Sequence, residues 1–166
     1  MNGAGVHGAP GAESGQSVKD ALQQTLDEAR MVLPGVQALF GFQLIAVFSN
    51  GFERRLDEAE RTLHLVAIAL VTIAIALVMT PAAYHRQVEP RRATVSFIAL
   101  ASRLVSVAML PLAAGLAIDL HLVARVITGM PAVSATIGVV SFLLFVALWF
   151  AFPQWRAAQL RRQHRR

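Results

Sequence analysis

The sequence of 166 residues contains no cysteine and few charged residues, and both absences restrict what the protein can be. Without cysteine, disulfide bonds, thiolate metal sites and cysteine nucleophiles are excluded. Charged residues make up only 15% of the chain, whereas soluble domains carry about 25%. Because 55% of the residues are hydrophobic and the mean hydropathy is +0.54, the composition indicates a membrane protein.

The sequence also lacks the short motifs that mark common catalytic sites. It has no glycine-rich phosphate loop, no Gly-x-Ser-x-Gly and no His-Glu-x-x-His element. His64, His121 and His164 do not have the spacing of metal ligands. We therefore expect no enzyme, no metal site and no cofactor.

One long apolar run, from Leu63 to Thr80, organises the rest of the chain. Its sequence, LHLVAIALVTIAIALVMT, contains one histidine at its edge and no other ionisable residue. A helix needs roughly 20 apolar residues to cross a bilayer core about 30 Å thick. Extended through Ala83, the run has that length, and it lacks the polar stripe of a soluble amphipathic helix. The run therefore predicts a transmembrane helix.

Three further apolar stretches are separated from this run by charged segments. They predict an all-α fold, a membrane bundle of four transmembrane helices. The domain is expected over residues 17–156, between a disordered leader at 1–16 and a basic cytoplasmic tail at 157–166. The expected spans are 31–48, 63–83, 95–118 and 130–152.

Two charged segments connect these spans on the predicted outer side. The sequence GFERRLDEAERT, residues 51–62, is expected to form one short helix that leads into the second span. After the third span, a short loop is expected to contain Asp119, His121 and Arg125.

Apolar residues recur at spacings of three and four between Val18 and Leu33, which predicts an amphipathic helix over Ser17–Arg30. Such a helix would lie at the membrane surface or against the bundle. A solvated helix that leads into the first span explains the pattern equally well. The first residues have neither a basic start nor an apolar run, so no cleavable signal peptide is expected.

The distribution of lysine and arginine predicts the orientation in the membrane. The N-terminal segment, the middle loop and the tail together hold ten such residues, and the two opposite segments hold four. Arg103 is left aside because it lies inside a span. Since positive residues favour the cytoplasmic side of a membrane, both termini are expected in the cytoplasm. The net charge of +5 therefore does not require a nucleic-acid partner.

Three short patches of the sequence carry a resemblance to a known family. They are DEARMVLPGVQALFGF, TPAAYHR and ASRL, and Ser102 in the last patch stands where the family often has asparagine. The matching residues are Glu28, Arg30, Gly35, Gln37, Phe40, Pro81, Ala83, His85, Arg86 and Arg103.

In these patches the chain resembles a family of small bacterial four-span membrane proteins of unknown function, over about Ser17 to Arg156. The resemblance implies the bacterial inner membrane and four helices. It brings no established activity, although some members carry names such as sodium–proton antiporter.

A group of interacting polar residues, the inner-face group, is expected at the inner face of the membrane. Its candidate members are Glu28, Arg30, Gln37, His85, Arg86 and Arg103. Arg103 lies roughly 12 Å along the third span, where an unpaired charge is costly, and Glu28 is the nearest acidic candidate. The favoured interpretation is a structural clamp. The alternative is a proton or cation site, because histidine changes its protonation near neutral pH.

Asp119 is the candidate polar residue of the outer face. It lies 16 residues after Arg103, about 24 Å along a helix, so the two cannot pair within one subunit. We expect Asp119 either to pair with Arg125 or to cap the following helix, which is a structural role.

The sequence thus predicts a small integral membrane protein with a structural or partner-binding role. Its expected partners are the lipid bilayer and either another membrane protein or a second copy. A second copy could pack on the small-residue face of the fourth span, formed by Ser134, Gly138 and Ser141. The alternative function is a proton-coupled cation transporter of the sodium–proton type. Such transporters are typically built from inverted repeats, for which one copy of this chain is too short.

Overall fold

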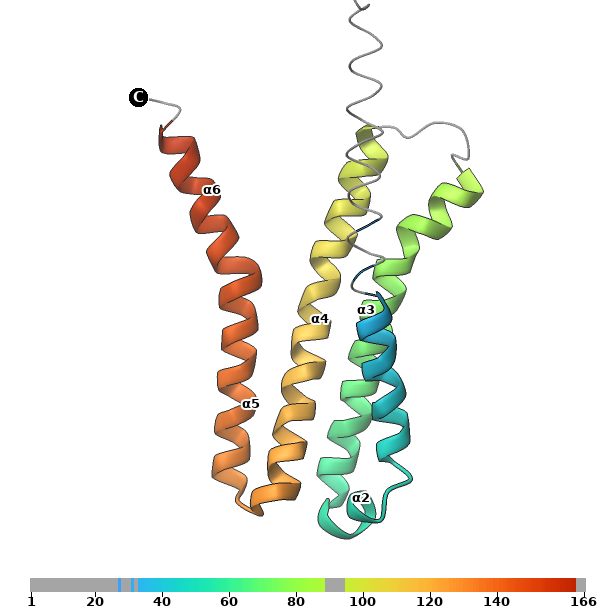
Figure 1. The fold of residues 1–166 in the computed structure, drawn as a ribbon, viewed down its shortest axis with the longest axis vertical. Helices are drawn as coiled ribbons and strands as arrows, with labels where there is room; N and C mark the ends of the chain where they lie inside the picture. Colours follow the sequence, from blue (N-terminus) through green and yellow to red (C-terminus); the bar gives the residue numbers. More distant parts are fainter. Residues whose placement is uncertain (1–26, 28–30, 32, 89–94, 164–166) are drawn as a thin grey trace, which may run out of the picture.

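The computed structural model describes residues 27, 31, 33–88 and 95–163, and these residues form helices and no strand (Figure 1). After a helix at Leu33–Ala46, the elements are α2 (Asn50–Arg55), α3 (Glu58–Val88), α4 (Val95–Thr128), α5 (Pro131–Val146), the π-helical turn η1 (Ala147–Ala151) and α6 (Phe152–Gln163). Three stretches within this described part are long and apolar enough to cross a membrane: Glu58–Tyr84, Ser96–Thr128 and Pro131–Gln163. The predicted all-α class is confirmed for these residues.

Helices α3 and α4 pack along each other and form the centre of the molecule (Figure 1). Their buried apolar residues are mostly alanines, which allow the two backbones to approach closely. Gly115 of α4 is at the tightest point, because a Cβ there would lie 2.9 Å from Cγ2 of Val71 and 3.3 Å from the carbonyl oxygen of Ala67. Close packing of small residues, rather than large interlocking side chains, therefore holds this pair.

The elements α5, η1 and α6 form one continuous helical segment, which we call the C-terminal arm. The arm contacts α4 through α5, where Ser134 is fully buried. Gly138 packs so closely that a Cβ would lie 2.9 Å from Cβ of His121. The small-residue face is therefore used against α4 of the same chain. Toward its end the arm diverges from α4 (Figure 1).

The π-helical turn η1 marks the point where the arm changes its hydrogen-bond pattern. The N–H of Phe152 donates to the carbonyl of Ala147, five residues earlier. Pro153 follows directly, and its ring and missing N–H disturb the regular α-helical ladder. The turn therefore lets a helix with a proline continue to Gln163.

The prediction of a loop after residue 118 is wrong, because α4 continues to Thr128. The segment after Gly115 contains no glycine or proline before Gly129, so no helix-breaking residue stops α4 at residues 119–128. Gly129 has a positive φ of 66° and its N–H donates to the carbonyl of Arg125, as in a glycine-terminated helix. Asp119 consequently lies inside α4 and not in a loop.

The single helix expected over residues 51–62 is also wrong, since α2 ends at Arg55 and α3 begins at Glu58. The N–H of Glu60 donates to Asp57 Oδ1 at 2.8 Å, and the N–H of Asp57 donates to Glu60 Oε2 at 3.0 Å. This reciprocal pair is a capping box, which starts a new helix. It leaves Leu56 extended and buried between the two helices.

The predicted leader at 1–16 and the predicted amphipathic helix at 17–30 lie outside the described residues, apart from Asp27, which is helical. In place of the first predicted span the structure has the Leu33–Ala46 helix, followed by a turn. The described part of this helix, Leu33–Ala46, is about 21 Å long at about 1.5 Å per residue, and we call it the short helix.

Candidate functional site

Three polar residues from three helices meet in the apolar interior, and we call them the polar cluster: Gln43 of the Leu33–Ala46 helix, His64 of α3 and Asp119 of α4. Gln43 Nε2 donates to Asp119 Oδ2 at 2.7 Å, and His64 Nε2 lies 3.0 Å from the Gln43 carbonyl oxygen. His64 Nδ1 lies 3.7 Å from Asp119 Oδ1. Each member of the cluster therefore contacts the other two.

The antiparallel course of α3 and α4 brings the cluster together. His64 lies six residues after the start of α3, and Asp119 lies nine residues before the end of α4. Gln43 lies three residues before the end of its own helix. All three positions are therefore near the same end of the bundle, at the lower end in Figure 1.

His64 binds a backbone group that the short helix leaves unpaired. The last four carbonyls of a helix have no partner within it, and the carbonyl of Gln43 is one of them. Because a carbonyl can only accept, Nε2 of His64 must carry the proton of this hydrogen bond. The ring also meets Phe52 of α2 edge-on, with the centroids 5.1 Å apart. These contacts fix the orientation of the imidazole.

In this fixed orientation, Nδ1 of His64 faces Asp119 and has two protonation states. Without a proton, the lone pair of Nδ1 faces a carboxylate. With a proton, the ring is an imidazolium ion that pairs with that carboxylate. His64 and Asp119 are two ionisable groups that face each other, and ionisable pairs of this kind inside a span often mark a proton or ion pathway.

One acceptor of the cluster is left without a partner among the described residues. Gln43 is 3% exposed, and its Oε1 makes no hydrogen bond. Gln43, His64 and Asp119 also line a cavity of about 370 Å³ between the short helix, α2 and α4. Apart from these three residues and Ser49, the cavity walls are apolar. The side chain of Asp119 keeps 17% of its surface exposed, and His64 keeps 7%.

A second set of polar contacts lies at the C-terminal end of α4. Arg125 pairs with Glu60 of α3 and also donates to the carbonyl of Gly129. Arg55 of α2 donates through Nη1 to the carbonyl of Val126 at 2.9 Å. The carbonyl of Val126 is one of the four that α4 leaves unpaired, and cations are favourable at this end of a helix dipole. The two arginines therefore cap α4 while tying it to α2 and α3.

The comparison with protein families identifies the chain. A family model described as "Family of unknown function (DUF6328)" matches residues 13–153, which is most of the sequence. The chain belongs to this family. The whole polar cluster and the cavity lie within the matched part of this DUF6328 member. No curated protein and no solved structure matches the chain, so no activity is transferred from a relative.

The residues predicted at the inner face of this DUF6328 member are only partly described. Gln37, Arg86 and Arg103 are exposed at their positions in the helices. Glu28 and Arg30 lie outside the described residues, and the side chain of His85 is not described. The predicted pairing of Glu28 with Arg103 and the clustering of these six residues therefore stay predictions.

At the opposite face, Asp119 contacts Gln43 and His64, whereas Arg125, its expected partner, pairs with Glu60. Asp119 and Arg125 are six residues apart on α4 and do not share a helix face, which explains the different partners. Gln43 and His64 were not predicted as members of this site. A usable signal existed, because each is a rare polar residue near the same predicted end of its span.

Proposed function

We propose that this DUF6328 member is a small integral membrane protein, not an enzyme, with a structural or partner-binding role. The observation that carries the proposal is the double attachment of Gln43, whose side chain binds Asp119 and whose carbonyl binds His64. Two attachments to two different helices fix both the position and the rotation of the short helix. The polar cluster thus serves first as a tie that assembles the bundle.

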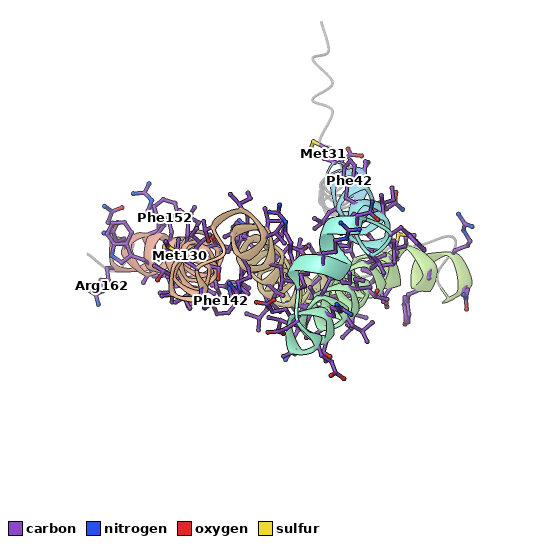
Figure 2. The ribbon with its side chains drawn as sticks, turned by 90° about the horizontal axis from the view of Figure 1, so that it is seen from below. Met31, Phe42, Met130, Phe142, Phe152 and Arg162 are labelled. Atoms are coloured by element: carbon purple, nitrogen blue, oxygen red, sulfur yellow. The ribbon has the colours of Figure 1, made fainter. Side chains whose placement is uncertain are left out.

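We further propose four spans, with both termini in the cytoplasm of a bacterial inner membrane. The end of α3 and the arm carry Arg86, Arg156, Arg161 and Arg162, and their described neighbours include no acidic residue. At the opposite end, the arginines are mixed with Asp57, Glu58 and Glu60. Over the whole sequence, ten lysine and arginine residues lie in the segments on the side of the arm's end and four on the opposite side. This excess supports the arm's end as the cytoplasmic side. Figure 2 shows Arg162 at the far end of the arm.

Cysteine labelling in intact cells tests this orientation, and the absence of native cysteine removes any background. A membrane-impermeant maleimide should label a cysteine at Asp57 and should not label one at Gln163. Labelling of both positions after the membrane is opened is the control for accessibility. The reverse pattern in intact cells would overturn the proposed topology.

A second function is favoured by one specific observation, the distance of 3.7 Å between the ionisable groups His64 Nδ1 and Asp119 Oδ1. A proton-coupled cation transporter needs an ionisable group of this kind within its spans. In that case Asp119 would bind a proton and a cation alternately.

Reconstitution in vesicles separates the two functions. The protein is placed in vesicles with an internal pH dye, and a sodium or potassium gradient is imposed. A structural role predicts a flat trace at several protein densities. Cation-dependent proton flux that is lost in Asp119→Asn but kept in Gly41→Ala would overturn the structural proposal. Gly41 is a suitable control because a Cβ there meets nothing within 4 Å.

A further inference from the structure

The cavity beside the polar cluster has chemistry that a structural tie does not use. Its volume of about 370 Å³ falls within the range of about 300–1,000 Å³ for small-molecule sites. Its walls include Leu39, Phe42, Leu56, Leu122, Val126 and Ile127. Such walls suit the tail of a membrane-soluble molecule, and the polar cluster sets the chemistry of the head.

The strongest acceptor at the polar end of the cavity is the carboxylate of Asp119. One N–H of Gln43 Nε2 donates to Asp119 Oδ2, and Nε2 of His64 donates to the carbonyl of Gln43. The acceptors that remain are the partly exposed carboxylate of Asp119 and the buried, unpaired Oε1 of Gln43. A buried acceptor without a partner is unfavourable, and a donor brought by a ligand would relieve it.

The charged group that lines the cavity favours a positive head. Asp119 lines the cavity, and none of the described lining residues is an arginine or a lysine. Farther out, Glu60 pairs with Arg125, and Arg55 keeps its charge while it donates to the carbonyl of Val126. His64 Nδ1 is 3.7 Å from Asp119, beyond normal hydrogen-bond distance, so the carboxylate keeps lone pairs for another donor. The ring of Phe52 also lines the cavity, and aromatic faces attract cations.

We propose that this cavity binds a lipophilic ammonium ion, a molecule with an N–H-bearing cationic head and an apolar tail. The head donates to Asp119 and, after a small rotation of the amide, to Oε1 of Gln43. The tail lies along the apolar walls between the Leu33–Ala46 helix and α4. The site goes beyond the proposed structural role and does not require transport.

Three ligands with the same tail test the proposal on the full chain in phosphatidylcholine nanodiscs. Heptylammonium, heptanol and heptanoate differ only in the head, and their binding is measured by calorimetry. Heptylammonium should bind about tenfold more tightly than heptanol, because charge-assisted hydrogen bonds are the stronger ones. Heptanoate should bind most weakly. Equal binding of heptylammonium and heptanol, or tighter binding of heptanoate, would overturn the proposal.

Two variants locate the ligand. Asp119→Asn keeps an acceptor for Gln43 but removes the charge, so it should weaken heptylammonium about tenfold and leave heptanol unchanged. Ala46→Leu adds volume to the cavity wall one helical turn after Gln43 and should weaken both ligands. Gly41→Ala on the same helix is the control and should change neither. Unchanged binding of heptylammonium in both Asp119→Asn and Ala46→Leu would place it elsewhere and overturn the site.

Phosphatidylethanolamine carries the same ammonium chemistry as a free amine. We propose a free amine as the natural ligand. In that case, discs that contain phosphatidylethanolamine should bind heptylammonium as tightly as discs without it. Competition by phosphatidylethanolamine would overturn the free amine as the source.

Discussion

The polar-cluster end of the bundle and the C-terminal arm are attached to α4 by different means. At the cluster end, side chains from the short helix, α2 and α3 all bond to α4, through Gln43, His64, Arg55 and Glu60. The arm packs on α4 at Ser134 and Gly138. In the most apolar window of the arm 6% of the residues are buried, against 22% for α3 and α4. Figure 2 shows α4 between these two regions.

In a bilayer, the proposed location of this protein, the difference has a physical reason. Lipid tails are as apolar as leucine, so helices in a membrane gain nothing by burying apolar surface against one another. Polar bonds and close packing of small residues remain as the sources of association. The cluster end relies on polar bonds and the arm relies on packing. The two regions should therefore respond to different substitutions.

Removal of Asp119 should have the largest effect, because it breaks the cluster end at its centre. Asp119→Ala leaves the Gln43 amide and His64 without their partner. A buried donor left without its partner typically costs about 1–3 kcal/mol. Because the substitution also removes side-chain volume from the interior, we expect the upper limit, about 3 kcal/mol of unfolding free energy. The measurement is reversible unfolding in mixed micelles, followed by circular dichroism.

The matched variant is Asp119→Asn, which can still accept from Gln43 and should lose about 1 kcal/mol. A loss in Asp119→Ala no larger than in Asp119→Asn would show that the bonds of Asp119 do not hold the bundle together.

The sequence predicted the helical class and the positions of the apolar helices well, because long apolar runs leave few alternatives. It placed the helix ends less well. The end of α4 depends on Gly129, and the break before α3 depends on the reciprocal Asp57–Glu60 bonds. Both signals were present, but the charged residues around them suggested a loop in one case and a continuous helix in the other.

The site was harder to predict than the fold. Asp119 was identified as a candidate, but its partners were not, since Gln43 lies 76 residues away in the chain. Periodicity reports which face of one helix is apolar and gives no rotation of one helix against another. Only the rotations of three helices bring Gln43, His64 and Asp119 together.

Two glycine variants should have the next largest effects and should separate the arm from the core. Gly138→Ala places a Cβ 2.9 Å from Cβ of His121, and Gly115→Ala places one 2.9 Å from Cγ2 of Val71. Overpacking of this kind costs about 1–3 kcal/mol. We expect Gly115→Ala to lower the stability of the whole bundle and Gly138→Ala to loosen mainly the arm.

Tryptophan fluorescence distinguishes the two outcomes, because both tryptophans of the chain, Trp149 and Trp155, lie in the arm. In Gly138→Ala the fluorescence transition should precede the circular dichroism transition. In Gly115→Ala the two should shift together. Coincident transitions in both variants would show that the arm and the core unfold as one unit.

The ion pair of Glu60 and Arg125 should have a smaller effect than the cluster. Both side chains are partly exposed, at 13% and 23%, so water weakens their attraction. A double-mutant cycle with Glu60→Gln and Arg125→Gln should give a coupling free energy of about 1 kcal/mol. Strictly additive losses would show that the pair adds nothing to the attachment of α3 to α4.

The smallest effect is expected at the basic end of the arm. Arg161 and Arg162 are exposed on α6, beyond the part of the arm that packs on α4. The double variant Arg161→Gln with Arg162→Gln should therefore change the unfolding free energy by less than about 0.5 kcal/mol, as is usual for surface positions. Their expected role is orientation in the membrane, so cysteine labelling at Gln163 is measured in the same variant. A loss above about 1 kcal/mol would mean that the arm is held by polar bonds at its end. The contrast between a region attached by polar bonds and a region attached by packing would then be wrong.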